Sequence, residues 1–342
     1  MFYEKLPNKR VRCKLCARYC QIPDGVLGFC RVRKNENGKL YSLVYGKLCS
    51  VEIDPIEKKP FFQFAPGSRT LSISTVGCTF HCAFCCNYPI SHDWEQIIGK
   101  DYTPEQVINL ALNKEVEGIS YTYTEPTVFY EFAYDCAKMA KERKLYNCFV
   151  TNAFTTPEAI KKISPYLDAA VVDFKASGNP KVLGKLSLVH KVEPIFDALL
   201  AYKKNKVYVE ITNLIIPDIG DDLRDVRKLC KWIVENLGDN IPLHFIRFFP
   251  SYKLIKPRTP IETLKRCYDV AKKEGLKYVY YGNVPGEKFE NTVCPDCGET
   301  LIERFNVYLT KFLLKKGCKC PNCGKEIIIE GKEWIPRRLW KQ

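Results

Sequence analysis

The sequence has no long hydrophobic run and almost no methionine. No apolar stretch reaches the ~18 residues that a membrane-spanning helix needs, so the sequence predicts no membrane span. The opening residues, MFYEKLPNKRVRCKLC, lack the apolar core of a signal peptide, and we therefore expect a cytoplasmic protein. Methionine occurs only twice, a composition compatible with a thermophile. Long internal repeats and low-complexity segments are also lacking, so we expect one large domain, alone or with one or two small ones.

Cysteine and positive charge, in contrast, are abundant. In a short secreted chain, 18 cysteines would indicate disulfides, but here the chain has 342 residues and its cysteines cluster at metal-ligand spacings. Metal or cluster binding in a reducing compartment is the better interpretation. The net charge of +14 is compatible with a nucleic-acid partner. Lysine and glutamate are interleaved, as in KKEGLK at 272–277, which favours a lysine-rich surface of mixed sign.

The fold class follows from the pattern between residues 66 and 288. Short runs rich in Val, Ile, Tyr and Phe alternate there with amphipathic stretches, which predicts an α/β fold with a complete or partial (β/α) TIM-type barrel. Thr103 and Gln106 predict a capping box at the start of one helix. Residues 1–65 are predicted to form a small cysteine-rich N-terminal module, and residues 289–342 a zinc-ribbon or rubredoxin-like one. The predicted strands are 71–77, 118–123, 146–151, 169–174, 207–213, 243–248 and 278–282.

The central cysteines follow the first predicted barrel strand. Cys78, Cys82 and Cys85 have the spacing CxxxCxxC, at which three thiolates can ligate three irons of one cubane. The fourth iron is then open to a cofactor, as in catalytic metal sites generally. The alternative is a structural zinc or an electron-transfer cluster, with Cys86 or His81 as the fourth ligand.

Two further cysteine sets flank the predicted barrel. Two CPxCG knuckles predict a closed four-sulfur site at the C-terminus, for zinc or, as the minor alternative, rubredoxin-type iron. The N-terminal set could hold zinc or an auxiliary 4Fe–4S cluster, and spacing does not decide between them. The C-terminal ligands are Cys294, Cys297, Cys320 and Cys323, and the N-terminal ligands are Cys13, Cys16, Cys20 and Cys30.

Polar residues near the ends of the predicted strands are candidates for the site, because barrel sites lie at the carboxyl ends of strands. Asp173 and Lys175 end the fourth strand, and we expect both in the site. Glu210 and Thr212 share one side of the fifth strand, where a cofactor contact and a mere barrel-interior contact are equally open. Arg247 is preferred to His244 as the group that would bind an anion.

The cluster loop, with Phe84 before its last cysteine, resembles that of the radical S-adenosylmethionine (SAM) superfamily. The resemblance implies that the methionyl group of SAM chelates the open iron, and that reduction releases a 5′-deoxyadenosyl radical. YTYTEP at 121–126 resembles the Gly-Gly-Glu-Pro-like turn of that superfamily, although Tyr-Thr replaces Gly-Gly. The superfamily patterns imply SAM-binding roles for Tyr123, Thr124, Glu125, Asn152, Asp173 and Lys175.

Nearly the whole chain resembles the radical SAM enzyme of the AmmeMemoRadiSam system, which is similar to pyruvate formate-lyase activating enzymes. The segments that carry the resemblance include CKLCARYC, DPIEKKPFFQFAPGSRTLSISTVGCTFHC and the CPDCG/CPNCG tail. The resemblance implies companion proteins of the Memo and AMMECR1 types and a low-potential electron donor of the ferredoxin or flavodoxin type. Cys86 departs from the pattern, because relatives commonly have Gln there.

We therefore expect a radical SAM enzyme that abstracts hydrogen from a protein or peptide. A first alternative is radical modification of RNA or of a small metabolite, which the charge and the basic tail favour slightly. A second alternative, from another class, is a non-catalytic iron–sulfur electron carrier or redox sensor.

Overall fold

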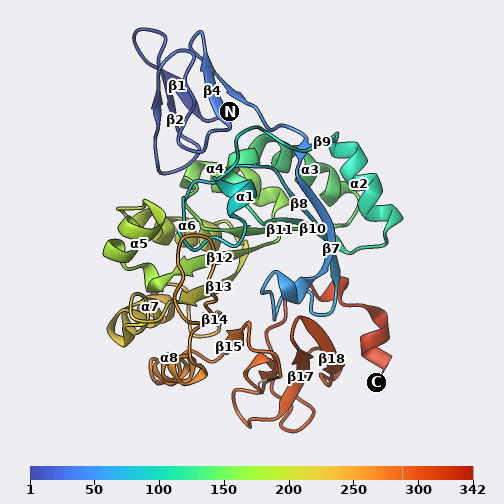
Figure 1. The fold of residues 1–342 in the computed structure, drawn as a ribbon. Helices are drawn as coiled ribbons and strands as arrows, with labels where there is room; N and C mark the ends of the chain where they lie inside the picture. Colours follow the sequence, from blue (N-terminus) through green and yellow to red (C-terminus); the bar gives the residue numbers. More distant parts are fainter. Residues whose placement is uncertain (287, 342) are drawn as a thin grey trace.

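A single curved sheet forms the centre of the computed structural model, which describes residues 1–286 and 288–341 (Figure 1). Its eight strands lie in the order β15-β14-β13-β12-β11-β10-β8-β7, and the edge strands β15 and β7 sit at opposite ends, so the barrel is incomplete. All of the predicted barrel strands are present, and they run parallel. Their bounds are β8 (Arg69–Ser74), β10 (Gly118–Tyr121), β11 (Tyr146–Thr151), β12 (Ala169–Lys175), β13 (Tyr208–Ile215), β14 (Leu243–Arg247) and β15 (Val279–Gly282). The structure confirms the predicted fold class in its partial-barrel form.

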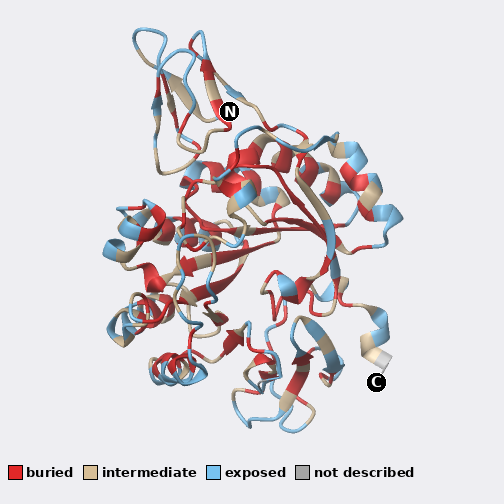
Figure 2. Ribbon diagram, in the orientation of Figure 1, coloured by how far each residue is buried: buried red, intermediate tan, exposed pale blue. Residues whose placement is uncertain are grey.

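Helices connect these strands and turn their buried sides toward the sheet (Figure 2). The predicted capping box at Thr103 is confirmed, because its side chain accepts from the Gln106 N–H and Gln106 bonds back to the Thr103 N–H. Two helices stop just before glycines with positive φ, Gly238 and Gly275, as predicted. The α-helices are α1 (Tyr88–Ser91), α2 (Pro104–Asn113), α3 (Tyr130–Glu142), α4 (Pro157–Ile163), α5 (Pro180–Ser187), α6 (Glu193–Lys204), α7 (Leu223–Asn236) and α8 (Ile261–Lys273).

The N-terminal residues form small antiparallel sheets at one end of the molecule, beside α1 and α4 (Figure 1). An ion pair anchors them, because the Arg33 guanidinium donates to both carboxylate oxygens of Glu131 on α3. The strand β7 (Ser50–Pro55) pairs antiparallel with β8 in the main sheet, although the sequence assigned it to the N-terminal module. The other strands here are β1 (Tyr3–Lys5), β2 (Val11–Cys13), β3 (Gln21–Ile22), β4 (Arg33–Glu36), β5 (Lys39–Ser42), β6 (Lys47–Leu48) and its partner β9 (Lys100–Asp101).

A loop at residues 56–68, between β7 and β8, packs into the sheet at the end where the parallel strands begin. It starts with a 3-10 turn, η1 (Ile56–Lys58), and then buries Phe61, Phe62 and Phe64. The Glu210 carboxylate on β13 accepts the backbone N–H groups of Phe62 and Gln63 at 2.8 to 3.0 Å. This loop therefore fills the part of the barrel interior where the parallel strands begin.

The C-terminal residues form a compact unit at the end of the sheet opposite to the N-terminal sheets (Figure 1). Its strands are β16 (Thr292–Val293), β17 (Thr300–Phe305) and β18 (Tyr308–Phe312), and its apolar core includes Phe62 and Tyr280 from the barrel. Arg304 is buried there, donates to the Phe62 carbonyl at 2.6 Å and stacks on the Phe62 ring. Glu287 and the last residue of the predicted C-terminal module, Gln342, lie outside the described residues. None of the helices in the described chain could cross a bilayer.

Candidate functional site

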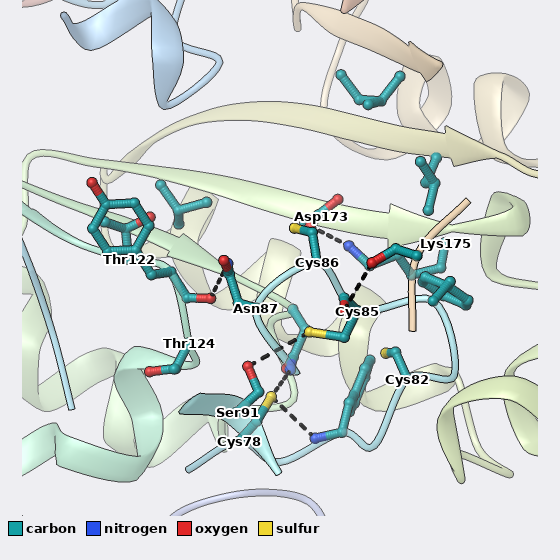
Figure 3. Close-up of a pocket in the computed structure, with 18 of the residues that line it drawn as sticks. Cys78, Cys82, Cys85, Cys86, Asn87, Ser91, Thr122, Thr124, Asp173 and Lys175 are labelled. Atoms are coloured by element: carbon teal, nitrogen blue, oxygen red, sulfur yellow. Dashed lines mark hydrogen bonds and ion pairs between the residues drawn. The ribbon is translucent and has the colours of Figure 1, made fainter. Parts of the chain in front are cut away.

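A cavity of about 600 Å³ opens at the carboxyl ends of the parallel strands, within the ~300–1,000 Å³ typical of small-molecule sites. Figure 3 shows the cysteine loop after β8 on one side of this cavity and the ends of β10 and β12 on the other. The predicted site residues that line it are Cys78, Cys82, Cys85, Tyr123, Thr124, Glu125, Asn152, Asp173, Lys175 and Arg247.

The three cysteines of the loop present their sulfurs to one region of this cavity (Figure 3). The Phe80 N–H and the Asn152 side-chain amide donate to the Cys78 sulfur at 3.4 and 3.7 Å, and Cys85 bonds to the Ser91 hydroxyl. Burial raises the pKa of the Cys82 thiol to about 12, and the nearby Lys175 ammonium opposes that rise. Among the described residues these sulfurs form no set within 4.8 Å, as a single ion would require. Their wider spread fits thiolates that bind separate irons of a cubane.

Neither candidate for a fourth ligand joins this set. Cys86 is exposed, and its sulfur is directed away from the other three in Figure 3. The His81 ring stacks between Phe29 and His92, at centroid distances of 4.2 and 5.1 Å. Burial lowers the pKa of His81 to about 4. Cys86 also lines the cavity, but its sulfur does not converge with the other three, so three sulfurs are the candidate cluster ligands and one corner of a cubane is left for an external ligand.

Glu125 lies beside the cysteines and is almost fully buried. Its Oε1 accepts hydrogen bonds from the Thr127 N–H, the Thr127 hydroxyl and the Thr151 hydroxyl, and its Oε2 accepts from the Asn152 N–H at 2.9 Å. Burial raises the pKa of this carboxyl, and these hydrogen bonds oppose the rise. Because a carboxylate oxygen has two lone pairs, Oε2 can accept a further donor from the cavity.

The turn before Glu125 has the backbone conformation that glycine usually provides. Tyr123 has φ of +62°, and its carbonyl accepts the Asn87 side-chain amide at 2.7 Å. The Tyr123 hydroxyl donates to Asp54 at 2.5 Å, and the Lys59 ammonium lies 4.1 Å from the centre of its ring. A left-handed non-glycine residue costs about 1–3 kcal/mol and persists where its surroundings fix it. Tyr123 therefore adopts the conformation that glycine would otherwise provide in this turn, and its side-chain and backbone contacts stabilise it there.

The remaining predicted residues divide into two groups. Asp173 and Lys175 line the cavity and form an ion pair with each other (Figure 3). Thr212 donates to Asp173 at 2.6 Å and so supports it from behind. Glu210 lies deeper, where its carboxylate contacts His244 Nε2 at 2.7 Å as well as the loop at 56–68. Neither Glu210 nor Thr212 is among the described residues that line the cavity.

Arg247 lies at the rim of the cavity rather than inside the barrel. Its Nε donates to the Thr259 carbonyl at 2.7 Å, and the rest of the guanidinium stays available to the cavity. Asn283, in the Gly-Asn-Val segment after β15, also lines the cavity and donates to the Arg247 carbonyl at 3.2 Å. His244, in contrast, faces the barrel interior.

Sequence reasoning missed several polar residues of the cavity, among them Lys58, Lys59 and Asn87. Lys58 and Lys59 both pair with Asp54 at 2.7 Å, and Lys59 is buried. They belong to the DPIEKKPFF segment, but no local pattern indicates that a residue before β8 returns to the site. Asn87 lies two residues after the last cysteine of the motif, and that proximity was the signal that could have identified it.

The C-terminal cysteines form a compact group far from this cavity. The ligand atoms of Cys294, Cys297, Cys320 and Cys323 all lie within 4.8 Å of one another, and two sulfur pairs are separated by 3.6 Å. Zinc–sulfur bonds of about 2.3 Å in a tetrahedron place sulfurs about 3.8 Å apart. The Glu299 N–H lowers the pKa of the Cys297 thiol to about 7. This donor set fits one tetrahedral metal ion.

Comparison with known proteins agrees with this geometry. The sequence profile described as the radical SAM superfamily matches residues 72–233. An uncharacterized protein of Methanocaldococcus jannaschii is 44% identical over 333 residues, which cover 96% of this chain and 98% of that protein. The pyruvate formate-lyase-activating enzyme of Clostridium pasteurianum is 25% identical over 179 residues, which cover 50% of this chain and 71% of that enzyme.

The fold also has solved counterparts. A radical SAM methyltransferase from Sphaerobacter thermophilus aligns with a TM-score of 0.50 and 16% identity, over 64% of this chain and 68% of that one. At this identity the likeness concerns the fold alone. The profile match begins inside β8 and includes the cysteine loop and the ends of β10, β11 and β12, where the cavity lies.

Proposed function

Because the chain belongs to the radical SAM superfamily and is a distant homologue of glycyl-radical activating enzymes, we propose that it cleaves SAM reductively for hydrogen abstraction from a protein or peptide. The observation that carries the proposal is a set of three cysteines that present their sulfurs to one region of the described cavity at the carboxyl ends of the strands, while the sulfur of Cys86, which also lines that cavity, is directed elsewhere. When bound there, a 4Fe–4S cluster and SAM supply a 5′-deoxyadenosyl radical.

The cavity residues have distinct proposed roles in binding SAM. Cys78, Cys82 and Cys85 would hold the cluster, and the free lone pair on Glu125 Oε2 would accept the methionyl ammonium. Tyr123 and Thr124 would shape the turn beside that ammonium. The Asn152 amide donates to Cys78 and thereby fixes that ligand, while the Lys175 ammonium sits near Cys82 and Cys85.

Lys175 and Arg247 are also the cavity cations proposed for the carboxylate of SAM or an anionic part of the substrate. Lys175 is paired with Asp173, which Thr212 supports, so its position is fixed before any ligand arrives. Glu210, in contrast, acts on the fold, because it binds the loop that closes the lower barrel. Glu210 is therefore not part of the proposed SAM site.

A protein or peptide substrate is supported by the homology to activating enzymes, whose names describe action on other enzymes. The loop after β14 adds a structural argument, since Phe249 at the cavity rim and Ile255 expose 44% and 86% of their surfaces. We further propose an AmmeMemoRadiSam-type enzyme with Memo-type and AMMECR1-type companions and a ferredoxin- or flavodoxin-type donor. The RNA alternative predicts salt-sensitive RNA binding, which a protein-directed enzyme would lack.

The metal proposals extend to both flanking modules. The C-terminal four-sulfur group is proposed to bind zinc, because its sulfurs already have tetrahedral spacing. The N-terminal cysteines are proposed to bind zinc or an auxiliary 4Fe–4S cluster. We retain the three-module division of the chain, with β7 and the loop at 56–68 counted as part of the barrel.

The decisive experiment measures 5′-deoxyadenosine from anaerobically reconstituted protein after reduction with dithionite. Wild type should form it from SAM, and Cys78→Ala should not, while both flanking metal sites stay occupied. Cys49→Ala, which alters a half-buried cysteine outside all three sets, is the matched control and should retain cleavage. An intact, reduced wild-type cluster that forms no 5′-deoxyadenosine would leave only the electron-carrier alternative. Unchanged turnover by Cys78→Ala would refute the assignment of that ligand.

A further inference from the structure

The N-terminal cysteines Cys13, Cys16, Cys20 and Cys30 line one cavity, although they come from different short segments. The remaining walls of the cavity are mostly apolar and include Leu15, Ile22, Phe29 and Val128. All four cysteines are free thiols. The four thiols therefore converge on one narrow, mostly apolar cavity.

The spread of these sulfurs distinguishes them from the C-terminal group. Within the described part of the chain, only Cys294, Cys297, Cys320 and Cys323 bring their ligand atoms within 4.8 Å of one another. One tetrahedral zinc requires sulfurs about 3.8 Å apart, whereas thiolates on a cubane bind different irons and stand farther apart. The N-terminal arrangement has the wider spacing.

Two arginines add donors to the same cavity. Arg33 is 3% exposed, lines the cavity and has a buried Nε with no partner in the described structure. The Nη2 of Arg18 is likewise buried without a partner. Buried N–H groups without acceptors are costly, and cluster sulfides and thiolates are acceptors that would satisfy them.

The N-terminal cavity and the catalytic cavity are separated by little more than the backbone at 77–79. An added Cβ at Gly77, which precedes Cys78, would lie 3.2 Å from the Cys30 carbonyl oxygen. The Arg18 guanidinium stacks on Phe29 and donates to the carbonyl of Thr79 at 2.7 Å. The two cysteine sets are thus neighbours across one turn of chain.

We propose that Cys13, Cys16, Cys20 and Cys30 bind a second 4Fe–4S cluster that relays electrons to the cluster site at Cys78, Cys82 and Cys85. The relay rests on the proposed function; the second cluster does not. One electron passes from a low-potential donor to the N-terminal iron and then to the catalytic iron, and no bond or proton is transferred. The buried arginines favour the reduced, more negative state of the N-terminal iron and set its potential.

The test begins with a triple variant, Cys78→Ala, Cys82→Ala and Cys85→Ala, reconstituted anaerobically with iron and sulfide. We expect about four irons per chain with the Mössbauer spectrum of a 4Fe–4S cluster, together with about one zinc. Adding Cys16→Ala and Cys20→Ala should remove the iron and leave the zinc, which reports that the chain is still folded. Adding Cys49→Ala instead should change neither count. About two zincs and no iron in the triple variant would overturn the proposal.

The second measurement is electron paramagnetic resonance of the reduced wild type without SAM. Two neighbouring paramagnetic clusters should broaden each other's signals, and each signal should sharpen when the other set of cysteines is removed. Two unbroadened signals would contradict the relay. About eight irons per chain without SAM cleavage would refute the proposed function but support the second cluster. SAM cleavage with only about four irons per chain would support the proposed function and refute the second cluster.

Discussion

The two flanking cysteine sets each contain four cysteines but occupy opposite environments in the fold. The C-terminal sulfurs are compact, Cys297 and Cys323 are exposed, and the group lies at the end of the barrel away from the cavity. The N-terminal sulfurs are more widely spread, line an apolar cavity and adjoin the cysteine loop after β8. Cysteine number is therefore a poor guide to role, whereas sulfur spacing and neighbours support the structural ion proposed for one set and the redox cluster proposed for the other.

The largest effect is expected at the C-terminal site. Replacing Cys297 and Cys320 by Ala should remove the proposed zinc and unfold the module locally, because structural zinc in small domains contributes about 10–16 kcal/mol to folding. Zinc analysis and limited proteolysis of residues 289–342 check this. Cys318→Ala, which alters a buried cysteine outside the ligand set, should keep the zinc. Loss of iron in the double variant would contradict the view that the two flanking sets are independent, because it would show that the N-terminal site depends on the C-terminal one.

A smaller effect is expected where the N-terminal module docks. Glu131→Gln leaves the buried Arg33 without its carboxylate, which should lower the free energy of unfolding by about 3–5 kcal/mol. Glu4→Gln is the matched control, because its pairs with Arg12 and Lys14 are exposed and worth less than about 1 kcal/mol. Denaturant unfolding measures both. Equal losses in the two variants would show that the buried pair does not anchor the module.

The smallest effect concerns the boundary between the two proposed cluster sites. Arg18→Leu removes a positive charge near Cys16, Cys20 and Cys78, so the more negative reduced state should be less stable. We expect midpoint potentials lower by on the order of 60 mV, which is a tenfold change in equilibrium for one electron. Arg12→Leu, at an exposed ion pair of the same module, should cause no shift. Redox titration followed by electron paramagnetic resonance provides the measurement, and equal shifts in both variants would refute a specific role for Arg18.

Local sequence patterns predicted the parts of the molecule that depend on local physics. Each parallel strand is an apolar run because both of its faces are buried, and the capping box at Thr103 closes within one turn. The cysteine loop was identified because its ligands are near in sequence. All of these features can be recognised without knowledge of distant contacts.

Long-range contacts were not predictable in the same way. Glu210 was correctly placed on the Thr212 side of its strand, but its backbone partners lie about 148 residues away in the sequence. The strand β7, with the sequence SVEIDP, is partly exposed along its length and lacks the continuous apolar run of a buried strand. Its sequence therefore did not indicate that it belongs to the main sheet. Lys59 and Asp54 reach Tyr123 only because β7 pairs with β8. Such residues are identified by packing, which a single sequence does not encode in its local pattern.

The central claim is that the cluster at Cys78, Cys82 and Cys85 has one iron without a protein ligand. Mössbauer spectroscopy of the 57Fe-reconstituted wild type, recorded with and without SAM, tests it most directly. The account predicts that SAM changes the isomer shift of one iron and leaves the others unaltered. Identical spectra in the two samples, with SAM shown to be bound, would contradict it.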